Sequence, residues 1–157
     1  MKQDEIRRFL SEFAAERLAL LQRHEAGARA VSNYDFNNTY QYVIAREETQ
    51  LTWLRNAIGE LGATLPPPSS PLPLPDGMQA ILEDDARRLG AFVERWRGPV
   101  AATTHARHRL MLEVILGESL EHKRFFEQAA AGFEDLLGRR TGGVPRVGEV
   151  LPTRWIE

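Results

Sequence analysis

The stretch GATLPPPSSPLPLP, residues 62–75, decides how the helices of this chain are connected. Proline at this density cannot continue a helix and favours extended polyproline II structure. At about 3.1 Å per residue, the 14 residues of this stretch span roughly 43 Å. The preceding helical pattern, residues 39–61, would be roughly 35 Å long at about 1.5 Å per residue. The proline-rich stretch is therefore long enough to run from one end of a helical bundle to the other.

Apolar residues recur at helical spacing on both sides of this stretch. A short polar cluster, residues 33–38, makes the first two helices antiparallel neighbours, with Asp35 or Asn37 as the cap of the second. Gly62 ends the second helix, Gly98-Pro99 ends the third, and Thr103 or Thr104 caps the fourth. The four predicted helices cover residues 4–32, 39–61, 77–96 and 104–137.

The reach of the linker predicts an all-α, up-down-down-up four-helix bundle with a long Pro-rich crossover between helices 2 and 3. The bundle covers residues 1–137. Residues 138–157 form an irregular C-terminal extension, whose Trp155 and Ile156 are expected to pack on the bundle or on a neighbouring subunit. The alternative is a flexible linker between two helical hairpins, although each hairpin alone would lack a core.

Composition narrows the class of protein. With 43% hydrophobic and 27% charged residues, the 157-residue chain has the balance of one ordinary globular domain. The formal net charge of -2 gives no basic surface for nucleic acid or for an anionic membrane. There are no cysteines, which excludes thiolate-bound metals. No apolar run approaches the ~20 residues that span a bilayer, and no signal peptide is evident. We therefore expect a soluble, cytoplasmic protein.

A carboxylate interrupts the apolar stripe of each predicted helix. Glu47 stands between Ile44 and Leu51 where the stripe of the second helix should continue. An ionised carboxylate in a core is unstable unless it is paired or bound to a metal. The corresponding residues of the other helices are Glu25, Asp85, and the group Glu118, Glu121 and His122.

These acids meet at one depth only if the crossover is long. Glu25 and Glu47 lie at similar distances from the first corner, and Asp85 and Glu118 at similar distances from the second. With the two corners at opposite ends of the bundle, all four acids converge. The pattern favours a carboxylate-lined cavity, with a metal site as its simplest use.

Three segments resemble the ferritin-like superfamily. The runs Arg46-Glu47-Glu48-Thr49-Gln50 and Gly117-Glu118-Ser119-Leu120-Glu121-His122 look like its two Glu-x-x-His elements, and residues 21–34 are similar to a first helix that supplies a single Glu. In that family, two helices supply one Glu each and two supply Glu-x-x-His, which together hold two iron or manganese ions.

The resemblance implies two Fe or Mn ions and an iron-oxidising or related O₂- or peroxide-linked reaction. Glu47 and Glu118 would bridge the ions, and Glu25 and Asp85 would be terminal ligands. The chain departs from the family pattern in that Gln50 and Glu121 stand where His is expected, while His122 is one residue out of frame. An oxygen-rich ligand set of this kind favours manganese, magnesium, calcium or iron.

Two alternatives remain open. His105 and His108 resemble the histidines of DinB-like bundles, which would imply a single zinc or nickel ion. A non-enzymatic bundle that has lost its site is the other, with its buried acids paired to arginines such as Arg17, Arg55 or Arg88. Such a bundle would associate, at least as a dimer, through exposed apolar residues, for which the candidates are Trp96, Phe126, Phe133 and Trp155.

Overall fold

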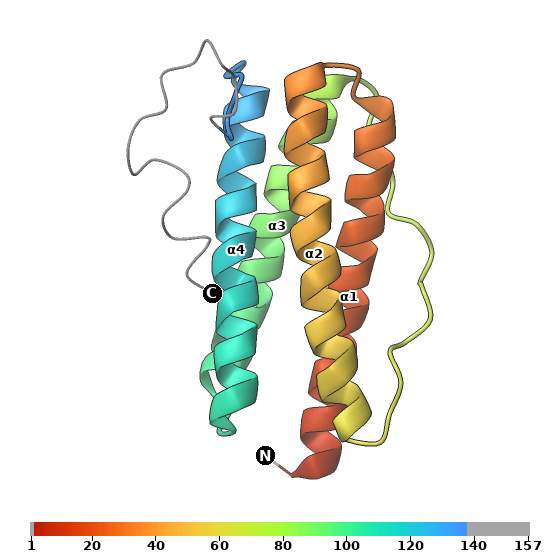
Figure 1. The fold of residues 1–157 in the computed structure, drawn as a ribbon, viewed down its shortest axis with the longest axis vertical. Helices are drawn as coiled ribbons and strands as arrows, with labels where there is room; N and C mark the ends of the chain where they lie inside the picture. Colours follow the sequence, from red (N-terminus) through yellow and green to blue (C-terminus); the bar gives the residue numbers. More distant parts are fainter. Residues whose placement is uncertain (1, 138–157) are drawn as a thin grey trace.

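The computed structural model describes residues 2–137, which form four long helices and, within that range, no strand (Figure 1). The prediction of an all-α, four-helix protein is confirmed. The predicted C-terminal extension, residues 138–157, lies outside the described residues. The helices are α1 (Gln3–Ala30), α2 (Tyr34–Glu60), α3 (Met78–Ala101) and α4 (Ala106–Ala130).

The α1–α2 corner is tighter than the sequence suggested. Asn33 is the N-cap of α2, and its side-chain oxygen accepts a hydrogen bond from the Phe36 amide at 3.0 Å. The predicted caps Asp35 and Asn37 are wrong, because both residues lie inside the first turns of α2. Asn37 instead donates its side-chain amide to the Ala28 carbonyl at 2.7 Å, which ties the start of α2 to the end of α1.

The second corner also differs from the prediction. Pro99 lies inside the last turn of α3. A proline there removes one backbone hydrogen bond and crowds the preceding turn, yet the helix continues to Ala101. His105, not a threonine, caps α4. The fourth helix ends at Ala130 rather than near residue 137, and Gly132 adopts φ +93 just beyond it, a conformation that stops a helix.

The core is continuous along the bundle. The closest neighbours are α1 with α2 and α3 with α4, and an aromatic cluster joins the first half of α1 to the second half of α3. In it Phe13 lies 5.1 Å from Phe92 and 5.3 Å from Trp96 between ring centroids. Trp96 and Phe126 are buried, so the expectation that they form surface contacts is wrong, whereas Phe133 is exposed.

The segment between α2 and α3 follows the outside of α1 (Figure 1). A buried side chain of α1 holds it there, since Arg23 Nε donates to the Pro73 carbonyl at 3.0 Å. Within residues 2–137, no helix combines the length and apolar character that crossing a bilayer requires.

A buried charged network as the candidate functional site

The interior contains charged and polar side chains from all four helices. Burying an ion costs several kcal/mol unless it is paired and hydrogen-bonded, so each of these groups needs a partner. The buried ionisable residues of the network are Arg17, Arg23, His24, Glu47, Asp84, Asp85, Glu118 and His122.

Arg17 lies at the centre of this network. Its side chain is 0% exposed, and its guanidinium forms an ion pair with Glu47 on α2. Its Nη1 also donates to Ser119 Oγ on α4 at 3.0 Å. Burial alone would raise the pKa of Glu47, but Arg17 and His24 outweigh that effect and lower this pKa to about 2. Glu47 is therefore ionised at neutral pH.

His24 connects Glu47 to a second acid. Its Nδ1 lies 2.6 Å from Glu47 Oε1, and because that carboxylate is ionised, Nδ1 must carry the proton. On the other side of the ring, Nε2 lies 3.8 Å from Asp85 Oδ1. Tyr40 donates to Asp85 Oδ2 at 2.5 Å. Burial raises the pKa of Asp85 although His24, Tyr40 and Arg23 oppose it, and burial together with the Asp85 charge raises the pKa of Tyr40.

Arg23 joins the two consecutive aspartates of α3. Its Nη2 lies 3.1 Å from Asp84 Oδ2, and its Nη1 lies 3.4 Å from Asp85 Oδ1. Asp84 also pairs with Arg87 and Arg88, each at 2.7 Å. Burial would raise the pKa of Asp84, but the three arginines lower it. Three guanidinium groups therefore face two carboxylates at this end of the network.

At the other end of the network, side chains of α2 form hydrogen bonds with Glu118. Arg46 donates Nε and Nη2 to its two oxygens, both at 2.9 Å, and Gln50 Nε2 donates at 3.2 Å. His122, one turn further along α4, is buried as well. Burial lowers the pKa of His122 to about 3, in spite of the opposing influence of Glu47. The ring is therefore neutral at physiological pH.

The structure places the predicted ligands in two groups. Five of the seven are buried in the network, namely Glu47, Gln50, Asp85, Glu118 and His122. Glu25 and Glu121 are half-buried, and the histidine beside each of them is the buried one. The acids follow one another along the axis, because Asp85 contacts Tyr40 while Glu118 contacts Gln50. Ten residues of α2 separate these two contacts, roughly 15 Å at the rise of a helix.

The partners of the buried acids are not evident from the sequence. The pattern offers Arg17 as one of several ion-pair candidates, and it does not mark Arg23 or Tyr40 as site residues. The signal that could have identified Arg17 is its register, because Leu10, Arg17 and His24 recur every seven residues on the buried face of α1.

The donor set does not match the two-ion site that the family resemblance implies. Glu47 is already neutralised by Arg17, and Glu118 by Arg46. Within residues 2–137, no group of three or more His, Asp or Glu side chains is arranged to hold a metal ion. His105 and His108 lie apart from this network, beside a surface cavity at the start of α4.

No protein-family model matches this chain, and no curated protein or solved structure is found to be similar to it.

Proposed function

We propose that this protein is a ferritin-like bundle in which internal arginines take the place of the metal pair, and that it works as a metal-independent, non-catalytic scaffold. The observation that carries this proposal is Arg17, which is fully buried and contacts both Glu47 and Ser119. Its guanidinium supplies positive charge between α2 and α4, next to the carboxylates that would otherwise attract ions.

The proposed up-down-down-up order is supported by contacts between α1 and α3. The first half of α1 meets the second half of α3, since Trp96 Nε1 donates to Glu16 Oε2 at 3.0 Å. The second half of α1 meets the first half of α3 through Arg23 and Asp84. These contacts favour antiparallel α1 and α3, and the path of residues 61–77 beside α1 (Figure 1) fits a long crossover.

The buried arginines support the proposal that the protein folds without a bound metal. A divalent ion added beside Glu47 or Asp85 would lie close to the fixed positive charges of Arg17 and Arg23. Like charges in a poorly solvated interior repel by several kcal/mol. The interior therefore favours its own guanidinium groups over a further cation.

The test is to remove Arg17 and supply the missing charge from solution. We expect Arg17→Ala to lower the free energy of unfolding by about 3–5 kcal/mol, because Glu47 would stay buried without its partner. Low concentrations of guanidinium or methylguanidinium should restore part of the lost thermal stability. Purified wild-type protein should contain no stoichiometric metal, and chelators should leave its melting temperature unchanged.

Arg97→Ala is the matched control, because Arg97 is mostly exposed and pairs with Glu94 on its own helix. That variant should change stability by less than about 1 kcal/mol and show no guanidinium rescue. Stoichiometric iron or manganese in the wild type, lost together with stability on chelation, would contradict the proposal.

A second candidate, a metal-binding ferritin-like protein with redox activity, is favoured by a separate observation. Four buried ligand-type atoms have no hydrogen-bond partner within the part of the chain that the structure describes: His24 Nε2, Gln50 Oε1, Asp85 Oδ1 and His122 Nδ1. A histidine that donates Nδ1–H to a carboxylate presents its Nε2 lone pair as metal-binding histidines do. Bound iron or manganese would supply electron transfer to O₂ or peroxide.

Anomalous scattering at the iron and manganese edges distinguishes the two candidates. The metal-binding candidate requires an anomalous peak between His24 and Asp85 and its loss in Glu47→Ala, which frees the His24 ring. The scaffold proposal expects no such peak after soaking with either metal.

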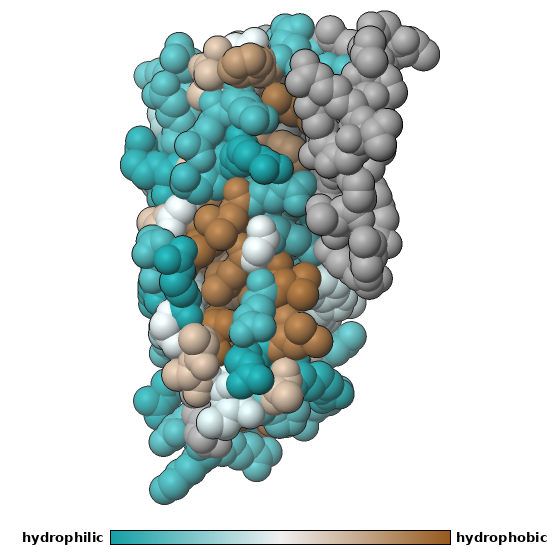
Figure 2. All heavy atoms as spheres, turned by 90° about the vertical axis from the view of Figure 1, so that its left-hand side faces the viewer, coloured by the Kyte–Doolittle hydropathy of each residue, from teal (hydrophilic) through white to brown (hydrophobic). Residues whose placement is uncertain are grey.

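A scaffold needs a partner surface, and we propose that a second copy of the chain binds α4. Figure 2 shows an apolar area on the face that α4 presents. Leu110 and Leu120 of α4 are 63% and 44% exposed. Light scattering should give a dimer mass, and Leu110→Arg should convert it to a monomer. A wild-type monomer at micromolar concentration would remove this part of the proposal.

A further inference from the structure

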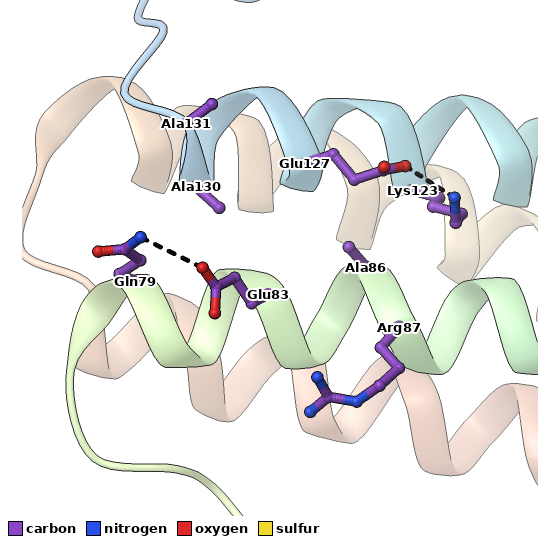
Figure 3. A pocket seen from close by; sticks show the side chains of 8 residues that line it. All are labelled: Gln79, Glu83, Ala86, Arg87, Lys123, Glu127, Ala130 and Ala131. Atoms are coloured by element: carbon purple, nitrogen blue, oxygen red, sulfur yellow. Dashed lines mark hydrogen bonds and ion pairs between the residues drawn. The ribbon is translucent and has the colours of Figure 1, made fainter.

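Two surface cavities differ in whether their polar groups are satisfied. The groove between α3 and α4 in Figure 3, with a volume of about 480 Å³, is lined by charged side chains and alanines. Its polar groups satisfy one another, because Gln79 donates to Glu83 at 3.2 Å and Lys123 pairs with Glu127 at 2.8 Å. This groove has no evident need of a ligand.

The second cavity lies where the ends of three helices meet, and it has a volume of about 370 Å³. The start of α1, the end of α2 and the segment leading into α4 surround it. Its ionisable side chains come from the segment leading into α4 and from Glu60. The lining residues are Gln3, Ile6, Glu60, Leu61, Thr103, Thr104, His105, Arg107 and His108.

His108 lines this cavity with an unsatisfied ring. The residue is only 5% exposed, yet neither ring nitrogen has a hydrogen-bond partner among residues 2–137. Its ring packs on that of His105, with centroids 4.2 Å apart. The ring nitrogens are not sealed in the core but open to the cavity, where a water, an ion or a ligand can bind them.

His105 lines the same cavity. Its Nδ1 accepts the His108 backbone amide at 3.4 Å as the N-cap of α4. Because Nδ1 acts as an acceptor, the proton of the neutral ring resides on Nε2, which can donate to another group. The first amides of the 25-residue helix α4 have no intrahelical partners and carry the positive end of the helix dipole.

We propose that this cavity is a binding site for a small oxyanion, a phosphate or carboxylate group, held by His105, His108 and the N-terminal amides of α4. Oxyanions bind at helix N-termini because amide donors and the dipole act together. Arg107 adds a guanidinium at the rim, where Glu60 now holds it in an ion pair. Glu60 is the only acidic residue among the lining residues of this cavity, and it competes with the ligand for Arg107.

The experiment follows the ring resonances of all four histidines by NMR while inorganic phosphate is added to the full chain, with acetate in a parallel titration. His105 and His108 should shift and saturate, whereas His24 and His122, buried inside the bundle, should not. A stronger response to phosphate assigns a phosphate-bearing ligand, and a stronger response to acetate assigns a carboxylate. No saturable shift with either anion, or equal shifts of all four rings, would overturn the proposal.

Two variants test the site, and they should change the affinity for the anion in opposite directions. His105→Asn keeps a side-chain N-cap, since Asn is among the preferred residues there, but it removes the Nε2 donor. It should weaken anion binding about tenfold without lowering the melting temperature. Glu60→Gln frees Arg107 and should strengthen binding. If His105→Asn binds the anion as the wild type does, the site is not the one described.

Discussion

Gly27 of α1 allows a close approach of Tyr40 of α2 beside the network. A Cβ atom placed there would lie 3.0 Å from the Tyr40 hydroxyl oxygen and 3.0 Å from its ring. Tyr40 is itself fixed by its hydrogen bond to Asp85, so it cannot move aside freely. We expect Gly27→Ala to reduce the free energy of unfolding by about 1–3 kcal/mol, measured by urea denaturation.

Gly117 provides the matched control for this substitution. It lies inside α4, and a Cβ atom there would meet no other atom within 4 Å. Gly117→Ala should therefore stabilise the protein by up to about 1 kcal/mol through helix propensity alone. Equal effects at the two glycines would mean that the contact with Tyr40 is not restrictive.

For individual residues, the sequence predicts which acidic side chains are buried better than it predicts their ion-pair partners. Glu47 is recognisable because it interrupts an apolar stripe on its own helix. Its partners Arg17 and His24 lie on another helix, so the pairing depends on how two helices are rotated against each other. Arginine also has a long apolar stem and is common on helix surfaces, which hides a buried guanidinium from pattern analysis.

The N-terminus of α2 is defined by a capping hydrogen bond to the Asn33 side chain. Asn33→Ala removes the side-chain acceptor of the Phe36 amide, and we expect a loss of about 1 kcal/mol in unfolding free energy. Asn38→Ala, within α2, is the control and should change stability little or improve it slightly. A similar loss in both variants would indicate a general effect of asparagine rather than capping.

Element boundaries follow from proline and glycine only where those residues stand outside a helix. Gly62 has φ +80 and follows the end of α2, as its position in the sequence predicts. Pro99 does not end α3 at once, because other hydrogen bonds close the last turn in spite of the lost amide and the crowding of the proline ring against the preceding turn. The Ala102 amide donates to the Gly98 carbonyl at 3.0 Å, and Thr103 donates its hydroxyl to the Pro99 carbonyl at 3.1 Å.

For the whole molecule, the burial of His122 makes stability depend on pH. The pKa of His122 falls from its ordinary 6.5 to about 3 on folding, so the unfolded chain binds a proton that the folded chain does not. Stability must therefore fall as pH drops from about 6.5 toward 3, by about 1.4 kcal/mol per pH unit for one proton. We expect His122→Leu to make the unfolding free energy less dependent on pH between pH 6 and pH 5.

Glu47 affects stability in a lower pH range than His122, so it provides an internal comparison for the His122 effect. Its pKa is about 2 in the folded state and 4.5 ordinarily, so its contribution is present above about pH 4.5 and is lost as pH falls toward 2. The lowered pKa of His108 and the raised pKa of Asp85 affect the wild type and His122→Leu alike. Parallel curves for the two proteins across pH 6 to 5 would show that His122 is not buried in its neutral form.

The buried position of Arg17 has a consequence for how the protein matures. A metalloprotein is synthesised without its metal and is complete only after it has bound an ion. The supply of that ion varies with growth conditions. Here the positive charge is encoded in the gene and arrives with the polypeptide, and arginine keeps its proton at any physiological pH. On our proposal, the folded form should accumulate at the same rate in iron-starved and iron-replete cells.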